Sequence, residues 1–545
     1  MQDVDKTLAD QRSSSRRTEK KQINFPDRRN KSERRITRVE RWITSRGIDR
    51  RKGKRYQLNT PVMVSDPWKS QSTITPKDIG KGGLFISATN GTIDHASKIT
   101  LSILIPGTNQ PISLDTKVIH TDGNEGVGIK FIEGPALNKL HRFLDKYERS
   151  QSKDFYQKFM NVSERLSDWE KRYKYFRQIN SGLNTRVTTK DQELLMFGSN
   201  NYLGLANHPK VKEAAINAIK KYGTGTGSTS VLSGSLSIHE TLQSRIAEFK
   251  GMESALLFGT GFTANLGVIS TLFYKDYILI NDEKNHVSIF EGCKRSRSRV
   301  RIYRHNDMEH LEKVLKLYQG SKDKKVIIVE SVFSMDGDLA RLPEIVWLAE
   351  KHNAAVVVDE AHASGILGKN GRGSIDFFNL IGRVDVITDS FGKAFASIGG
   401  YVASSKEVTD YIKHFSSASI FTTSLPPSVC ATILAVIDVL ENEPEIIDKF
   451  WENAQIIRQG LRQLGFNIGT SNTHIIPVIL GDEAKTYQFC GMLQEYGVFV
   501  SAVGRPAVKR GEARLRVSVM ASHEKDELAK ALEVFESVGK KLRVI

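Results

Sequence analysis

The 545-residue chain has only three cysteines, Cys293, Cys430 and Cys490, and they lie far apart. Their odd number and their spacing argue against a disulfide framework and a zinc site, so we expect no bound metal ion. No run approaches the ~18 uncharged apolar residues of a membrane span. The N-terminus also lacks the apolar core of a signal peptide. We therefore expect a cytoplasmic protein.

The positive charge of the chain is concentrated at its start. The net charge is +17, and residues 1–55 contribute +11 of it, with 19 Lys or Arg against 8 Asp or Glu. Such a charged, apolar-poor segment predicts a disordered tail over residues 1–49, either merely solvated or in peripheral contact with the anionic inner membrane surface. Because the charge is local, we expect no specific nucleic-acid partner.

A pattern of short alternating strands follows the tail. The apolar segments are residues 61–64, 84–86, 99–105, 112–114 and 127–131. With Gly, Pro, Asn and Asp between them, they predict about five or six strands in a small β-barrel over residues 50–146. Helical spacing from Ala136 to about Tyr173 predicts a helix that caps the barrel and continues into a helical linker over residues 147–175.

From Phe176 onward, short apolar runs alternate with helix-like segments. The runs are residues 255–258, 277–280, 326–329, 354–358 and 384–387. This pattern is typical of parallel strands covered on both faces, so residues 176–441 are predicted to form a large α/β domain. Mixed helices and strands after Asn442 predict a smaller α+β domain over residues 442–545. The glycine-rich stretch 223–234 follows a helix rather than a strand, which favours a flexible loop near a ligand over a dinucleotide fingerprint.

Two predicted strand ends carry candidate chemistry. Asp359 closes one strand, and Lys393 follows the next strand in a loop of small residues. Ligands of α/β sheets bind at the carboxyl ends of strands. A lysine there with an acidic partner is the arrangement of a Schiff-base lysine opposite a pyridinium nitrogen. The alternative is a structural lysine with a helix-capping aspartate.

Eight segments in order resemble a known family. They are SNNYLGL (199–205), GTGFTAN (259–265), NHVS (285–288), VFSMDGD (332–338), DEAH (359–362), SFGK (390–393), FTTSLPP (421–427) and ARLR (513–516). From about residue 176 to the end, the chain resembles the α-oxoamine synthases, pyridoxal 5'-phosphate enzymes of the fold-type-I aminotransferase superfamily.

The resemblance implies a catalytic set. Lys393 would bind the cofactor aldehyde and later act as acid and base. Asp359 would keep the pyridine nitrogen protonated, so that the ring accepts electrons. His286 would stack on the ring, and His362 would hydrogen-bond its phenolic oxygen.

The same resemblance implies the binding residues. The amides of Gly261 and Phe262 would hold the cofactor phosphate beside Ser390, and Ser334 would lie near the ring. Thr422 and Thr423 would reach the phosphate of the partner subunit, which implies a homodimer with shared active sites. Arg516 would clamp the amino-acid carboxylate, with Asn200 nearby.

The predicted barrel resembles a PilZ domain, which binds cyclic di-GMP. Arg51 and Arg55 match the RxxxR motif, and Asp78 and Gly83 match the [D/N]xSxxG motif, with Gly80 in place of the usual serine. Two guanidinium groups can meet phosphates and guanine faces. The resemblance therefore implies cyclic di-GMP as a regulatory ligand.

The combined hypothesis is an acyltransferase that condenses a small amino acid with an acyl thioester, carried by coenzyme A or acyl carrier protein, with loss of carbon dioxide. The segments at 285–293 and 420–428 are similar to serine palmitoyltransferase, which favours serine. Glycine C-acetyltransferase, 8-amino-7-oxononanoate synthase and autoinducer synthases stay open. The alternative class is a cyclic di-GMP receptor that uses the large domain as a dimeric output scaffold.

Overall fold

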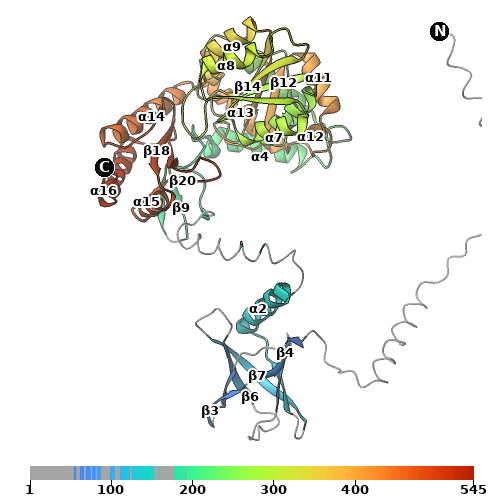
Figure 1. The fold of residues 1–545 in the computed structure, drawn as a ribbon, viewed down its shortest axis with the longest axis vertical. Helices are drawn as coiled ribbons and strands as arrows, with labels where there is room; N and C mark the ends of the chain where they lie inside the picture. Colours follow the sequence, from blue (N-terminus) through green and yellow to red (C-terminus); the bar gives the residue numbers. More distant parts are fainter. Residues whose placement is uncertain are drawn as a thin grey trace, which may run out of the picture. The chain divides into compact units, whose positions relative to one another are not determined.

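The structure is a computed structural model. It describes residues 55–56, 62–66, 69–74, 76–80, 83–87, 98–104, 111–122, 126–151, 159, 162, 177–190 and 192–545. The predicted tail, Arg51 and nearly all of the predicted linker beyond residue 151 lie outside the described residues. The chain divides into two units, Met1–Arg165 and Leu166–Ile545, each of which is described by itself (Figure 1).

The strands predicted for the small barrel are present in the first unit, where they form one eight-stranded antiparallel sheet. Its strands are β1 (Arg55–Tyr56), β2 (Val62–Asp66), β3 (Lys69–Ile74), β4 (Pro76–Gly80), β5 (Gly83–Ser87), β6 (Lys98–Leu104), β7 (Pro111–Asp122) and β8 (Gly126–Phe131). Their order is β1-β4-β5-β8-β7-β6-β2-β3. The eight strands exceed the predicted five or six because β1, β3 and β4 are short or polar and show little apolar alternation.

Helix α2 (Pro135–Gln151) packs on this sheet. Leu137, Leu140 and Leu144 of α2 join a core that includes Leu84 and Ile129 from the strands. The helical spacing had predicted this contact, and the structure confirms that the helix covers the strands. Its apolar stripe is buried against the sheet, as amphipathic helices require.

A mixed sheet forms the centre of the second unit. Its strands are β11 (Ser254–Phe258), β12 (Tyr277–Asp282), β13 (Arg299–Tyr303), β14 (Lys324–Glu330), β15 (Ala354–Asp359), β16 (Val386–Ser390) and β17 (Gly400–Ser404). Their order is β11-β17-β16-β15-β14-β12-β13. Strands β12 to β16 pair in parallel, and β17 runs antiparallel between β16 and β11.

Both faces of this sheet are buried, as the continuous apolar runs predicted. Along β14, Val326 and Ile328 join one core cluster, whereas Ile327 and Val329 join another. Strand side chains alternate between faces, so the two clusters lie on opposite sides. The helices are α4 (Pro209–Tyr222), α5 (Ser237–Lys250), α6 (Gly261–Leu272), α7 (Val287–Ser296), α8 (Met308–Lys316), α9 (Leu342–Lys351), α10 (Ser374–Phe377), α11 (Lys406–Phe415), α12 (Ser417–Ile420) and α13 (Pro427–Asn442), with short 3-10 turns η1 (Leu205–Asn207) and η2 (Lys369–Gly371).

Three features of this sheet were not predicted. Strands β13 and β17 were missed, and β16 extends to Ser390, whereas the apolar run ends at Ile387. Strand β13 lies at the sheet edge and carries two arginines among its apolar residues, so it has no continuous apolar run. The end of β16 is polar, yet Thr388, Asp389 and Ser390 pair with β17. The polar residues of β16 are therefore fixed in a strand.

The C-terminal part has two small sheets and three helices. The elements are α14 (Glu445–Gln463), β18 (Ile475–Gly481), α15 (Glu483–Glu495), β19 (Val498–Phe499), β20 (Ser501–Val503), β21 (Ala513–Ser518) and α16 (Lys525–Lys541), joined by β9 (Arg186–Thr188) and β10 (Glu193–Met196). One sheet has the order β18-β21-β20, and the other β19-β10-β9. Strands β9 and β10 precede the large sheet in sequence yet pair with β19, a long-range contact that no local pattern reveals.

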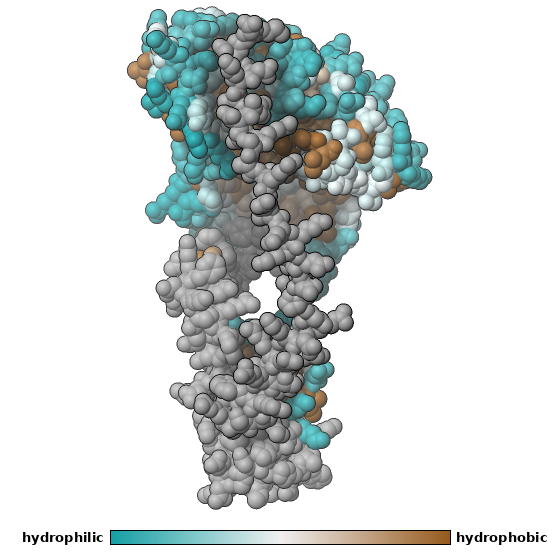
Figure 2. Space-filling model, turned by 90° about the vertical axis from the view of Figure 1, so that its right-hand side faces the viewer, coloured by the Kyte–Doolittle hydropathy of each residue, from teal (hydrophilic) through white to brown (hydrophobic). Residues whose placement is uncertain are grey.

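The surface of the second unit is mostly hydrophilic where Figure 2 shows it, with apolar side chains exposed in several places. Across the described part of the chain, no helix combines the length and the apolar character that a membrane crossing demands.

Candidate functional site

A cleft lies where the strands of the mixed sheet end. Its lining comprises Gly261, Phe262, Asn265, His286, Ser288, Glu330, Asp359, Ala361, His362, Asp389, Ser390 and Lys393. The empty space is about 340 Å³, including the part that is open to solvent. The structure thus brings together seven of the predicted site residues from segments more than a hundred residues apart.

Asp359, the last residue of β15, and Lys393, in the turn after β16, face this cleft. Burial lowers the pKa of the Lys393 amine below its ordinary value, although the carboxylate of Asp359 opposes that shift. A depressed pKa increases the fraction of neutral, nucleophilic amine. The parallel pairing of β15 with β16 places the ends of these two strands side by side.

Asp359 is held in place by hydrogen bonds. Its Oδ2 accepts from Nδ2 of Asn265 at 2.6 Å, and its Oδ1 accepts from the backbone amide of Ala361 at 2.9 Å. The side chain is 6% exposed. Both oxygens are therefore oriented, and the carboxylate keeps a fixed direction toward the cleft.

His286 stands at the open side of the cleft, at the start of α7. Its Nδ1 accepts from the backbone amide of Ser288 at 3.3 Å and lies 2.7 Å from the Ser288 hydroxyl. Partial burial lowers the pKa of the ring below its ordinary value. A neutral ring whose Nδ1 accepts carries its proton on Nε2.

A buried tyrosine connects Arg516 with His362. The Tyr202 hydroxyl accepts from Nη2 of Arg516 at 3.2 Å and lies 2.8 Å from Nδ1 of His362. The hydroxyl also lies 3.3 Å from Oδ1 of Asn200, so both this oxygen and Nδ1 of His362 are within reach of its proton. Burial, followed by the charges of Lys393 and Arg516, lowers the pKa of His362 well below its ordinary value.

Arg516 is the centre of a second group of contacts. Its Nη1 donates to Oδ1 of Asn200 at 3.0 Å, and its Nε donates to the carbonyl of Ser334 at 2.8 Å. Arg514 and Arg516 are 2% and 8% exposed, so β21 does not present a solvated arginine face. The structure thus places Asn200 beside Arg516, and Ser334, which was expected near the cofactor ring, contacts Arg516 through its backbone carbonyl.

Two buried acids complete the cleft. Glu330 is 3% exposed, and its Oε1 has no hydrogen-bond partner among the described residues. Burial, reinforced by the charge of Asp359, raises the pKa of Glu330 well above its usual range. Burial also raises the pKa of Asp389 to about 6. Burial thus favours the neutral form of Glu330, which has an unpaired oxygen beside Asp359.

The start of α6 meets the end of β16 at close range. The Thr260 side chain accepts from the amide of Thr263, which leaves the amides of Gly261 and Phe262 directed out of the helix end. A β-carbon on Gly261 would lie 2.4 Å from Cβ of Ser390, so only glycine permits this approach. An anion-binding helix end beside a hydroxyl, with an amine and a carboxylate across the cleft, fits a phosphorylated pyridine aldehyde.

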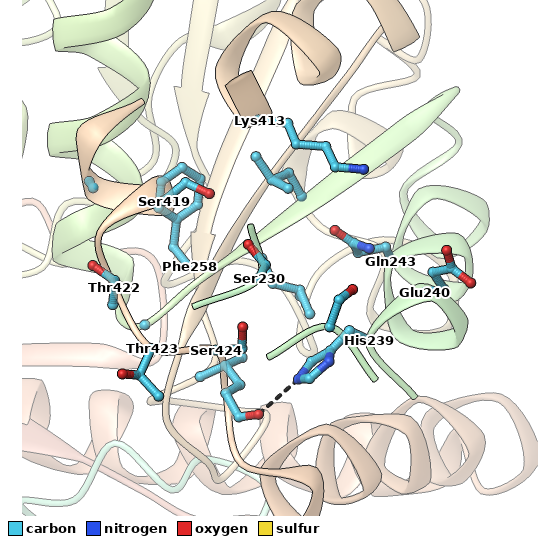
Figure 3. A pocket seen from close by; sticks show the side chains of 16 residues that line it. Ser230, His239, Glu240, Gln243, Phe258, Lys413, Ser419, Thr422, Thr423 and Ser424 are labelled. Atoms are coloured by element: carbon cyan, nitrogen blue, oxygen red, sulfur yellow. Dashed lines mark hydrogen bonds between the residues drawn. The ribbon is translucent and has the colours of Figure 1, made fainter. Parts of the chain in front are cut away.

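Thr422 and Thr423 line a different pocket. Figure 3 shows them with Ser419 and Ser424 along one wall, and His239, Glu240 and Gln243 of α5 along the other. Thr423 also forms a β-bridge with Thr229 of the glycine-rich stretch. Within one chain, the structure therefore separates these threonines from the cleft that holds Lys393.

In the first unit, strand pairing brings the two PilZ-like motifs together. Arg55 of β1 lies opposite Gly80 of β4, and Asp78 of β4 lies opposite Phe85 of β5. A β-carbon on Gly83 would lie 2.0 Å from the carbonyl oxygen of Ile129, so β5 needs glycine there. Arg51 lies outside the described residues.

Sequence reasoning missed Tyr202, Asn265, Ser288 and Glu330. The first three lie inside the motif segments 199–205, 259–265 and 285–288, so those segments held the signal. Glu330 follows the apolar run of β14 at the same sheet edge as Asp359. Its position at a strand end was the only available indication.

Comparison with known proteins defines the class. The aminotransferase class I and II family model matches residues 192–535, and the PilZ domain model matches residues 49–146. The chain therefore belongs to the class I and II aminotransferase family. Within that family it is an α-oxoamine synthase, a pyridoxal-phosphate enzyme, and its PilZ domain indicates cyclic di-GMP binding.

Individual relatives support this placement. The 8-amino-7-oxononanoate synthase of Thermoanaerobacter pseudethanolicus is 45% identical over 386 residues, which are 70% of this chain and 98% of that protein. The structure of Sphingomonas wittichii serine palmitoyltransferase matches with a TM-score of 0.69 at 32% identity, over 72% of this chain and 100% of that chain. The structure of 8-amino-7-oxononanoate synthase from Francisella tularensis matches with a TM-score of 0.56 at 27% identity, over 65% and 99%.

Proposed function

We propose that the chain condenses a small amino acid with an acyl thioester. The new C–C bond joins the amino acid's Cα to the acyl carbon, the C–S bond breaks, and carbon dioxide and a thiol leave. The observation that carries this proposal is the convergence of Lys393, Asp359, His286 and His362 on one cleft.

The cofactor would supply an electron sink for the Cα carbanion. Lys393 would bind it covalently and move the Cα proton, since burial lowers the pKa of its amine. Asp359, held by Asn265 and Ala361, would face the pyridine nitrogen. His286 would cover one face of the ring, and His362 would hydrogen-bond the phenolic oxygen.

The remaining residues would orient the substrates. Gly261, Phe262 and Ser390 would hold the cofactor phosphate at the start of α6. Arg516 would bind the amino-acid carboxylate in a bidentate manner, beside Asn200 and Ser334. This carboxylate is the group lost as carbon dioxide. By holding it, Arg516 would determine which bond to Cα aligns with the cofactor ring.

The relatives favour alanine and an acidic acyl group. In 8-amino-7-oxononanoate, the amine-bearing carbon and the methyl group are what alanine leaves after losing carbon dioxide. The other seven carbons, which end in a carboxylate, must come from the acyl group. The identity to such synthases, 41–46% over the relatives compared, supports this pair more strongly than the two short segments support serine.

Serine with a long acyl chain is the second candidate. It is favoured by the higher TM-score of the serine palmitoyltransferase structure, 0.69 against 0.56. Parallel assays of alanine and serine, each with a seven-carbon dicarboxylic and a palmitoyl thioester of coenzyme A, separate the candidates by the mass of the amino ketone. A product from serine and palmitoyl thioester alone would reverse our preference.

The enzyme would act as a homodimer with shared sites. Thr423 and the neighbouring Phe421, which is 79% exposed, are open on the single chain, and the threonines lie away from their own chain's cleft. Mixing Lys393→Ala chains with Thr422→Ala/Thr423→Ala chains would then restore one intact site per mixed dimer, or about a quarter of wild-type activity. No recovery after verified subunit exchange would mean that each chain builds its own site.

Cyclic di-GMP would bind the first unit and alter activity. Arg55 beside Gly80, with Asp78 on the same strand, supports this proposal. A ligand shifts an equilibrium only by its differential affinity for two states, typically with ~1 to 3 kcal/mol of coupling. Calorimetry of the full chain should show binding that Arg51→Ala/Arg55→Ala abolishes. Absence of heat at high ligand concentration would leave a constitutive enzyme.

A further inference from the structure

One buried amide touches two of the groups that line the cleft. Nδ2 of Asn265 donates to Oδ2 of Asp359 at 2.6 Å and to the hydroxyl of Ser288 at 3.0 Å. Asn265 is 4% exposed and Ser288 is fully buried. Both amide hydrogens are therefore used inside the protein, one in the hydrogen bond to Asp359 and the other in the hydrogen bond to Ser288.

The orientation of this amide is also fixed by a hydrogen bond to its oxygen. Oδ1 of Asn265 accepts from Oγ1 of Thr388 at 2.6 Å, and Thr388 is 1% exposed on β16. A flipped amide would place an oxygen against the carboxylate of Asp359 and an NH2 against a donor. Three contacts thus select one orientation of the Asn265 side chain.

Hydrogen bonds extend from Asn265 through Ser288 to His286. Because Asn265 donates to the Ser288 hydroxyl, the hydroxyl proton is free to point at Nδ1 of His286, 2.7 Å away. The backbone amide of Ser288 donates to the same nitrogen. Nδ1 then accepts twice, and the ring proton lies on Nε2.

We propose that Asn265 is a positioning residue that holds the carboxylate of Asp359 and the ring of His286 in one hydrogen-bonded unit, with the imidazole proton on Nε2. Asn265 would act through these two residues and need not touch the substrate. Its consequence for catalysis rests on the proposed function, whereas the position of the proton does not.

The first test locates the proton in the wild-type protein. Magic-angle-spinning NMR of the full chain with ¹⁵N-labelled histidine rings distinguishes bare from protonated nitrogens, and His286→Asn identifies the signals of His286. At neutral pH we expect a bare Nδ1 and a protonated Nε2. A proton on Nδ1 would overturn the proposal, whatever reaction the enzyme catalyses.

The second test removes the shared donor. In Asn265→Leu, which keeps the approximate shape, Asp359 and Ser288 lose the amide that joins them, so the ¹⁵N signals of His286 should shift or broaden relative to the wild type. The matched control is Asn453→Leu, a buried asparagine whose amide donates to the carbonyls of Met520, Ala521 and His523 and which should leave these signals unchanged. An unchanged His286 spectrum in folded Asn265→Leu would contradict the proposal.

Kinetics give a third readout. Asn265→Ala should lower kcat roughly ten- to a hundredfold, as expected for loss of a hydrogen bond to a charged group. KM for the amino acid should change less than about twofold, because Arg516 does not contact Asn265. A rise in KM at constant kcat would overturn the positioning role. If a variant does not fold, the wild-type spectrum still decides the question.

Discussion

The hydroxyl of Tyr202 lies 2.8 Å from Nδ1 of His362 and 3.2 Å from Nη2 of Arg516. One buried oxygen thus joins the residue expected to meet the cofactor with the residue expected to meet the substrate. Tyr202 is fully buried, so a water molecule could replace its hydroxyl only if a cavity large enough to hold that water were present.

Tyr202→Phe should weaken both contacts with little change in shape. We expect kcat/KM for the amino acid to fall roughly ten- to a hundredfold, corresponding to about 1 to 3 kcal/mol for unpaired buried partners. Steady-state kinetics with thermal unfolding as a control measures this. Unchanged kcat/KM would show that Arg516 and His362 act independently.

Lys393→Ala should abolish turnover and covalent attachment of the cofactor, because Lys393 is the lysine that lines the cleft. Borohydride treatment followed by mass spectrometry of peptides detects the attachment. Lys413→Ala, an exposed lysine of the neighbouring pocket, is the matched control and should retain it. Cofactor fixed at another lysine of the Lys393→Ala protein would refute the assignment.

Arg516→Ala should weaken amino-acid binding and leave the cofactor spectrum intact. Removing one member of a buried charge pair costs roughly 2 to 5 kcal/mol. Spectrophotometric titration with the amino acid reports the affinity, and the exposed Arg505→Ala serves as a control. Binding at wild-type concentrations would mean that another group, with Arg514 the first to test, holds the carboxylate.

Stability should depend on pH through His305. Its Nδ1 and Nε2 lie 2.9 and 2.8 Å from Asp282 and Asp338. Burial opposes the charged ring, yet the two carboxylates outweigh it and raise the pKa of His305 to about 9. With an unfolded pKa of about 6.5, the stabilisation is complete below pH ~6.5 and is lost as pH rises through ~9.

His305→Asn should therefore unfold at a lower temperature than the wild type at pH ~6. Its free energy of unfolding should be lower by up to ~3 kcal/mol. The difference should shrink as pH rises from ~6.5 to ~9 and be lost above ~9. Thermal melts of both proteins across this range check the sign. A difference that grows with pH would show that His305 is neutral in the folded protein.

The sequence predicted the parts of the site that lie on strand ends and in motif segments. Lys393, Asp359 and His286 follow apolar runs or motifs, and the structure brings them to one cleft. The pairing of β10 with β19 and the insertion of β17 depend on long-range contacts, which local periodicity cannot reveal. The same holds for Tyr202, whose significance appears only when Arg516 and His362 approach it from distant segments.

The most direct measurement of the central claim is product analysis of the purified full chain with pyridoxal 5'-phosphate. A panel of amino acids and acyl thioesters is incubated with the wild type and with Lys393→Ala, and mass spectrometry follows the amino ketone, the thiol and carbon dioxide. We predict one mole of each per turnover with the wild type, best with alanine and a dicarboxylic acyl thioester, and none with the variant. Absence of an amino ketone from every pair, with bound cofactor present, would contradict the account.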